Sequence, residues 1–189
     1  MEADWEVEIG GDAPVIEACW DGFVDLRQTP EHAAYLSEAQ ECPALRNALM
    51  RLNAPSSSVW TSKCDVWPPD NFDPDELDAP NGAGNCAIAC YIDLLPRTPE
   101  QWPSPSQAVA ACQALCSRLR NLRLPGSRAD LIVRRAFVVP GHPDLGITAY
   151  LTACGSTQAQ ARATLAAALG LLVDAVLKQG FTNAGSKLQ

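Results

Sequence analysis

Two segments of this chain resemble each other at an offset of about 70 residues, and this internal similarity restricts the fold more than any other feature of the sequence. The matching stretches occur in the same order in both halves: Phe23–Glu31 with Tyr91–Glu100, Cys42–Leu45 with Cys112–Leu115, and Leu52–Pro55 with Leu122–Pro125. Because chance does not readily produce an ordered series at a nearly constant offset, we interpret the series as the duplication of one structural unit.

Each copy shows the same succession of local patterns. Alternating apolar and polar residues predict a strand, a Thr-Pro-Glu turn follows, and a helix and a second strand complete the unit. Two β-α-β units in tandem predict an α+β fold, a ferredoxin-like duplication in which about three helices pack on a mostly antiparallel sheet. The pseudo-repeats span about 15–67 and 86–139, with strands expected at 16–26, 59–67, 86–94 and 131–139 and helices at 42–52 and 106–122.

Further elements are expected on both sides of the duplicated region. The stretch 5–9 alternates and predicts a short strand, whose neighbours the sequence leaves open. A hairpin strand and a long final helix are expected within 145–179. Between 163 and 177 only Thr164 and Asp174 are polar, so this helix must be buried on more than one side. Another helix or a second subunit must cover it, and we predict a homodimer formed through the C-terminal helix or an edge strand.

Composition places the chain among globular proteins. Hydrophobic residues make up 47% and charged residues 19% of the 189 positions, which excludes intrinsic disorder and suits a single domain spanning 1–189. A net charge of −8 argues against nucleic acid and acidic membranes as partners. The first residues lack the basic start and apolar core of a secretion signal, and no apolar run reaches the roughly 18 residues that span a bilayer. We therefore expect a cytoplasmic protein.

Eight cysteines raise the question of disulfides or metal. No Cys-x-x-Cys pair is present, and thiols stay reduced in the cytoplasm, so we expect small core residues and no metal site. Cys112 and Cys116 fit this view because they share the apolar stripe of one predicted helix. The glycine-rich stretches lack the spacing of a nucleotide-binding loop, and no Gly-x-Ser-x-Gly motif is present. We predict no cofactor and assign no catalytic residue.

The strand expected at 59–67 is the most polar of the chain and is our main candidate for ligand binding. Strict alternation places Thr61, Lys63, Asp65 and Trp67 on one face and Trp60, Ser62, Cys64 and Val66 on the other. An indole beside charged groups can hold a small ligand, although charged side chains also keep ordinary edge strands from pairing with other chains. The candidate binding residues of this strand are Trp60, Lys63, Asp65 and Trp67.

Charge is divided unevenly along the chain. Residues 1–100 hold 19 of the 22 acidic residues, whereas 101–189 hold 9 of the 14 basic residues, which predicts complementary surfaces that meet within the fold or across a dimer. A second interpretation is a site for a small anionic ligand, because guanidinium groups bind carboxylates and phosphates in two-point contacts. Arg134, on a predicted strand, and His142, in a predicted turn, are the candidates added on this ground. Asp25 and Asp93 occupy equivalent places in the two copies and are expected to pair or cap at strand ends.

Three functional hypotheses follow. The first, which we prefer, is a non-enzymatic dimeric binding or assembly module. The second is a small-molecule enzyme of unknown reaction, whose pocket is lined by the Trp60–Trp67 strand and contains Lys63, Asp65 and either His142 or Arg134. The third is a regulatory module that binds a small anion.

Overall fold

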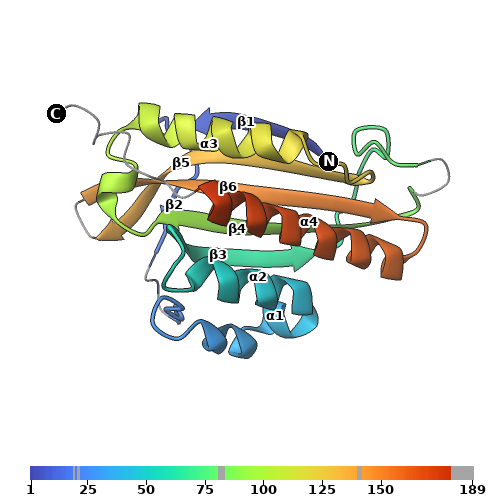
Figure 1. Cartoon of the computed structure of the whole chain (residues 1–189), viewed down its shortest axis with the longest axis horizontal. Coiled ribbons are helices and arrows are strands. Elements are labelled where there is room, and N and C mark those ends of the chain that lie inside the picture. The colour runs from blue at the N-terminus through green and yellow to red at the C-terminus, as the bar shows by residue number, and fades with distance from the viewer. Residues whose placement is uncertain (19, 21, 81–83, 140–141, 180–189) are drawn as a thin grey trace.

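One six-stranded mixed sheet carries the fold, and the three long helices pack on one of its faces (Figure 1). The computed structural model describes all residues except 19, 21, 81–83, 140–141 and 180–189. The strands are β1 (Glu2–Glu8), β2 (Ile16–Glu17), β3 (Val59–Trp67), β4 (Cys86–Pro96), β5 (Ser127–Val139) and β6 (His142–Gly155). The helices are α1 (Ser37–Glu41), α2 (Pro43–Asn53), α3 (Pro105–Arg120) and α4 (Gln158–Gln179), with 3₁₀ turns at Pro30–Tyr35 and Pro99–Gln101.

The sheet is mostly antiparallel, so the predicted α+β class is confirmed. Its strand order is β1-β5-β6-β4-β3, and β2 also pairs with β5. β1 and β2 run parallel to β5, whereas β5, β6, β4 and β3 form an antiparallel series. The short strand that the sequence left unplaced is therefore β1, at the edge of the sheet beside β5.

The two predicted units differ in topology. β4 and β5 are both antiparallel to β6, so β4-α3-β5 is a β-α-β unit of parallel strands with β6 between them. In the first copy, β2 is parallel to β5 and hence antiparallel to β3. The strand order therefore departs from the ferredoxin-like duplication, because β6 occupies the place beside β4 that we expected for the first strand of the first copy.

Most of the described part of 16–26 is irregular rather than extended in a sheet, and only Ile16 and Glu17 pair as β2. Gly22 adopts a φ of 85°, a conformation that glycine accepts without strain and that breaks an extended strand. The Asp25 carboxylate accepts hydrogen bonds from the backbone N–H of Arg27 at 2.9 Å and from its Nη2 at 2.6 Å. Local bonds of this kind compete with a sheet ladder, which is why the alternating pattern did not become a strand.

The segment 16–26, called the strap below, crosses the helix-free face of the sheet. Ile16 lies opposite Ala136 of β5, while the Ser62 hydroxyl on β3 donates to the Glu17 carbonyl at 2.8 Å. In Figure 1 this part of the chain passes behind the sheet. Gly146 of β6 leaves room for the crossing, because a Cβ there would lie 2.6 Å from Ile16 Cδ1 and 3.0 Å from the Leu94 carbonyl oxygen. The strap thus covers one end of the helix-free face.

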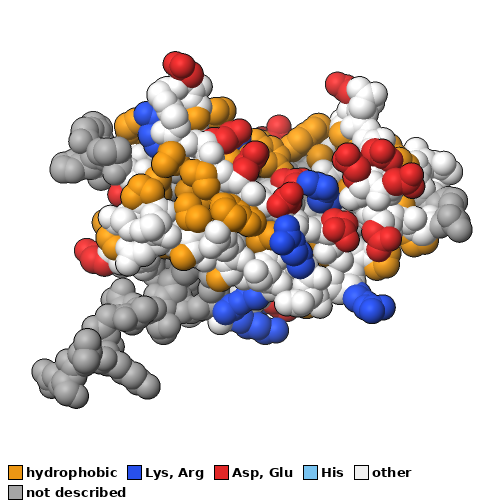
Figure 2. Space-filling model, turned by 90° about the horizontal axis from the view of Figure 1, so that it is seen from above, with side chains coloured by type: hydrophobic (Ala, Val, Ile, Leu, Met, Phe, Trp, Pro, Cys, Tyr) orange, Lys and Arg blue, Asp and Glu red, His pale blue; other side chains and the backbone are white. Residues whose placement is uncertain are grey.

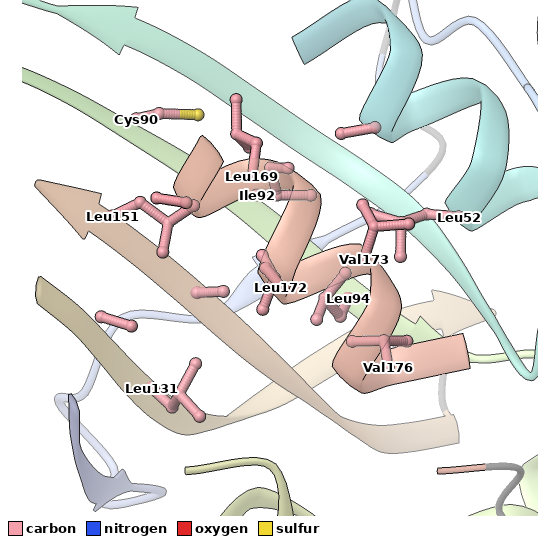
Figure 3. Packing of buried hydrophobic residues seen from close by; sticks show 14 of the residues in the cluster. Leu52, Cys90, Ile92, Leu94, Leu131, Leu151, Leu169, Leu172, Val173 and Val176 are labelled. Carbon is pink, nitrogen blue, oxygen red and sulfur yellow. The ribbon is translucent and has the colours of Figure 1, made fainter. Parts of the chain in front are cut away.

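The main core lies between the helices and the other face of the sheet. Leu169 and Leu172 of α4 point toward β4, where they meet Ile92 and Leu94 (Figure 3). Leu52 of α2 closes one flank of α4, and α3 packs along the other. The prediction that α4 is buried on more than one side is confirmed, with neighbouring helices of the same chain supplying the cover. By length and composition α4 is also apolar enough to span a membrane, and 44% of its most apolar stretch is buried in the protein.

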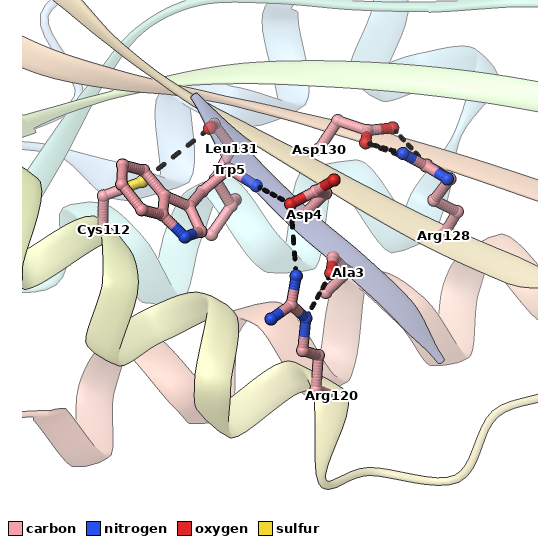
Figure 4. Close-up of polar contacts among 8 residues, drawn as sticks. All are labelled: Ala3, Asp4, Trp5, Cys112, Arg120, Arg128, Asp130 and Leu131. Atoms are coloured by element: carbon pink, nitrogen blue, oxygen red, sulfur yellow. Dashed lines mark hydrogen bonds and ion pairs between the residues drawn. The ribbon is translucent and has the colours of Figure 1, made fainter. Parts of the chain in front are cut away.

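At the β1 edge, the basic half of the chain meets the acidic half. Arg120 of α3 donates from Nε to the Ala3 carbonyl at 2.6 Å and from Nη2 to the Asp4 carboxylate at 3.1 Å (Figure 4). On β5, Arg128 pairs with Asp130 at 2.8 Å. The Arg120 contacts show that complementary charges of the two halves meet within one chain, as the uneven charge distribution predicts.

Candidate functional site

The helix-free face of the sheet is polar at its centre and covered at both ends. The strap covers one end, and at the other Leu77, from the loop that joins β3 to β4, packs on Ala87 and Cys154. Between these covers lie Tyr91 of β4 and Tyr150 of β6, opposite each other with ring centroids 5.7 Å apart. The pocket that Tyr91 lines, beside this centre, is where a ligand can reach the sheet.

The covering loop makes its end of the molecule acidic. Residues 68–84 contain five Asp or Glu residues and no Lys or Arg. Figure 2 shows acidic side chains gathered on the right, at the end of the molecule where this loop lies. Such a field disfavours the approach of anions and favours that of cations.

A pocket of about 290 Å³, the strap pocket, lies where the strap meets the edge strand β3. Trp20 and Phe23 of the strap form an aromatic side, Glu38 of α1 lies on a second side, and Lys63 of β3 and Tyr91 of β4 are among the other lining residues. Ligand pockets combine apolar walls with a few polar groups in this way, and this volume is at the small end of their range.

A bulge in β3 sets the position of Lys63. The pairing of β3 with β4 changes register between Thr61 and Cys64, so the two residues between them fall out of the ladder. Asn53, at the end of α2, holds the bulge: its Oδ1 accepts from the Thr61 backbone N–H at 3.0 Å and its Nδ2 donates to the Thr61 hydroxyl at 2.7 Å. Lys63 Nζ then lies 3.5 Å from the Glu17 carboxylate and 5.1 Å from the centroid of the Trp20 ring.

The bulge also changes which β3 residues share a face, and our prediction for Trp60 was wrong. Trp60 lies opposite Leu95, so it shares the helix-free face with Asp65 and Trp67. It is 2% exposed and donates from Nε1 to the Pro96 carbonyl at 3.0 Å, so it serves the core. Asp65 and Trp67 do lie on one face as predicted, but outside the strap pocket. Lys63 is the β3 candidate that lines the pocket.

Arg134 is held by protein groups. Its guanidinium pairs with Glu8 at 2.8 Å and lies within hydrogen-bond distance of the Tyr150 hydroxyl at 3.2 Å and of Thr148 Oγ1 at 3.4 Å. These contacts leave it little capacity for an added anion. The backbone of His142 begins β6 rather than forming a turn, and its side chain lies outside the part of the structure that is described.

Asp93 is a buried carboxyl at the centre of the helix-free face. It is 5% exposed and accepts a hydrogen bond of 2.6 Å from the Thr148 hydroxyl. Burial raises its pKa above 3.8, and this effect exceeds the opposing effects of the Thr148 bond and of the positive charges on Arg134 and Lys63. Asp25, its counterpart in the first copy, is paired with Arg27, so the two equivalent carboxyls have different surroundings.

We expect Asp93 to make stability depend on pH in a way that Asp93→Asn removes. The folded state binds the Asp93 proton more tightly than the unfolded state, so its contribution to the free energy of unfolding decreases as pH rises from about 3.8 through the folded pKa. Urea unfolding at several pH values should show the stability of the natural protein falling relative to Asp93→Asn as pH rises. Asp65→Asn, at an exposed position, controls for loss of a charge, and a pH-independent difference for Asp93→Asn would contradict the expectation.

Cys64 is a poor nucleophile, and the described cysteines do not gather with other metal ligands. Cys64 lines the strap pocket, but burial and the nearby carboxylates of Glu38, Asp65 and Asp93 raise its pKa to about 12, so it stays a thiol at neutral pH. The seven cysteines within the described ranges are free thiols, and Cys19 lies outside them. Within the described ranges, no three His, Cys, Asp or Glu side chains lie close enough together to form a metal site.

Of the pocket residues the sequence identified Lys63 alone, and it gave no indication of Trp20, Glu38 and Tyr91. They come from the strap, from α1 and from β4, and no spacing in the sequence relates these three segments.

Comparison with protein-family models, curated proteins and solved structures finds no match to this chain.

Proposed function

We propose that this protein is a non-enzymatic binding module that holds a small polar ligand in the strap pocket and works as a homodimer. The observation that carries the proposal is the pocket itself. It encloses about 290 Å³ and sets the Lys63 ammonium and the Glu38 carboxylate among aromatic and aliphatic walls. Polar groups placed among apolar side chains in this way fix the orientation of a bound ligand.

Binding is favoured over catalysis by the state of the reactive groups. Cys64 remains protonated at neutral pH. Arg134, one of the groups that the enzymatic hypothesis needs beside Lys63, is paired with Glu8. His32 lies against the ring of Tyr35, with centroids 5.5 Å apart, and is not among the residues that line the pocket.

A pocket-filling variant tests the proposed site. Leu36 lines the pocket, whereas its neighbour Tyr35 is 75% exposed, so Leu36→Trp fills the pocket and Tyr35→Trp places the same indole outside it. We expect some members of a panel of amino acids, short carboxylic acids, amines and sugars to raise the melting temperature of the natural protein and of Tyr35→Trp. A ligand at a hundredfold excess over its Kd adds about 2.7 kcal/mol of stability. Equal shifts in Leu36→Trp, or no shift in any protein, would contradict the proposal.

The homodimer is proposed through the outward face of α4. This face is apolar and exposed at Ala163, Ala166 and Ala167, next to a groove of about 500 Å³ between α2 and α4. The β1 edge suits a second copy less well, because its four carboxylates would face an identical set.

Light scattering at micromolar concentration should report about twice 20.2 kDa for the natural protein. Ala167→Glu should shift the particle to the monomer, since a buried unpaired charge opposes association. The matched substitution Ala110→Glu, at an exposed position of α3, should leave the mass unchanged. A monomeric natural protein would refute this part of the proposal without affecting the pocket.

A further inference from the structure

The charges in the strap pocket are of opposite sign and come from different elements. Lys63 lies on β3, and Glu38 lies on α1. α1 packs against β3 and both residues line the same pocket, so the carboxylate of Glu38 lies beside the strand that carries Lys63. A ligand in this pocket therefore meets both signs of charge.

Among the described residues, Glu38 has no cationic partner. The residue is half-buried, and its carboxylate accepts a hydrogen bond of 3.0 Å from the Ser37 hydroxyl next to it in sequence. No Lys or Arg of the described chain lies within ion-pair distance of it. A half-buried carboxylate beside an apolar cavity is stabilised by a cation, and the cavity gives a ligand's ammonium access to it.

Lys63 is held loosely. Its Nζ lies 3.5 Å from the Glu17 carboxylate, and the two side chains are 36% and 61% exposed. Exposed pairs of this kind contribute little, so a carboxylate that enters the pocket can replace Glu17 at small cost. The Trp20 ring lies beside Nζ and limits the movement of the ammonium group on that side.

The remaining lining combines apolar side chains with Thr61 and Ser62 of β3. Phe23, Val24 and Leu26 of the strap face the pocket, together with Leu36 and with Leu49 of α2. An aliphatic or aromatic group of a few carbon atoms would lose its contact with water against these walls.

We infer that the strap pocket binds an α-amino acid with an apolar side chain, its ammonium on Glu38, its carboxylate on Lys63 and its side chain against the strap and α2. The inference rests on the proposed function, because it names the class of ligand that the same pocket takes. A molecule that carries only a carboxylate leaves Glu38 half-buried without a cation, and one that carries only an ammonium leaves Lys63 in its weak pair with Glu17.

Matched probes separate the two charges. L-Leucine and L-phenylalanine carry both; 3-methylbutylamine and 2-phenylethylamine lack the carboxylate, and 4-methylpentanoate and 3-phenylpropanoate lack the ammonium. In NMR titrations at pH 7 up to about 10 mM, at least one amino acid should bind roughly tenfold or more tightly than both of its analogues, since each lost charged contact costs about that factor.

Two variants test whether Glu38 binds the ammonium of the ligand and Lys63 its carboxylate. Glu38→Gln should weaken the amino acid roughly tenfold or more and leave the carboxylate analogue unchanged, whereas Lys63→Gln should weaken the amino acid and leave the amine analogue unchanged. Lys178→Gln, at an exposed position of α4, is the matched control and should change nothing. Analogues that bind as tightly as the amino acid, or variants that weaken all probes equally, overturn the inference.

The failures of the two proposals are distinguishable. If neither amino acid binds, but other compounds raise the melting temperature of the natural protein and not of Leu36→Trp, the class of ligand is wrong and the binding function stands. If Leu36→Trp responds to every compound as the natural protein does, the pocket is not the site and both proposals fail.

Discussion

Gly155→Ala is expected to lower the free energy of unfolding by at least about 2 kcal/mol. Gly155 ends β6 three residues before α4 begins, and a Cβ at this position would lie 2.6 Å from the Ala161 nitrogen and 2.8 Å from the Gln160 Cβ. Both atoms belong to the first turn of α4. The strand cannot move aside freely, because the Gly155 carbonyl accepts a hydrogen bond from Asn85 at 3.2 Å. The helix must therefore shift, and its packing on the sheet shifts with it.

A second glycine provides the control. An added Cβ at Gly10 meets nothing within 4 Å, so Gly10→Ala should stay within about 0.5 kcal/mol of the natural protein. The loss of chain entropy in the unfolded state favours alanine at both positions, so any destabilisation at Gly155 is net of that gain. Urea denaturation measures both variants. Similar stabilities for the two would show that α4 accommodates the methyl group and that the β6–α4 junction is loosely packed.

The long helices and the hairpin strands could be predicted from the sequence because each of their patterns is compatible with one type of element. The stripe of α3 and the apolar length of α4 predicted both helices to within a few residues. The antiparallel pairing of β5 with β6 followed from two alternating stretches separated by a short turn. Local periodicity sufficed in these cases because each element packs one recognisable face.

The strap could not be derived in the same way. Its alternation from Ile16 to Leu26 is as regular as that of a real strand, and the outcome depended on competition for the edge of β4. β6 takes that edge with an uninterrupted ladder from Ile147 to Gly155. The strap keeps its local turns at Gly22 and Asp25 and crosses the sheet instead. The sequence pattern does not show whether β6 or the strap pairs more strongly with β4.

The candidate site was predicted in part, for a related reason. Lys63 was identified because β3 is unusually polar, but strict alternation assigned Trp60 to the wrong face. One extra residue in a strand reverses the face of all the residues that follow it, and the bulge after Thr61 does this. Glu38 gave no signal, since it lies in a five-residue helix whose place against β3 is a tertiary property.

Asn53→Ala is expected to have the second large effect, about 2–3 kcal/mol of lost stability. Asn53 is fully buried and makes three hydrogen bonds: Nδ2 donates to the Leu49 carbonyl at 2.8 Å and to the Thr61 hydroxyl at 2.7 Å, and Oδ1 accepts from the Thr61 N–H at 3.0 Å. Alanine leaves the Thr61 N–H buried without this partner, and that desolvation accounts for most of the expected loss. Asn47→Ala, at an exposed position of the same helix, should cost less than about 0.5 kcal/mol.

The same substitution separates a purely structural role of Asn53 from one in positioning the pocket. Because Asn53 fixes the bulge, its loss should let Lys63 move away from Trp20 while the protein remains folded. Under conditions where Asn53→Ala is fully folded, a compound that stabilises the natural protein through the strap pocket should bind more weakly to the variant, and a probe that does not depend on Lys63 should bind unchanged. If the variant is destabilised but binds every probe normally, Asn53 supports the fold alone, and the bulge does not determine where Lys63 lies.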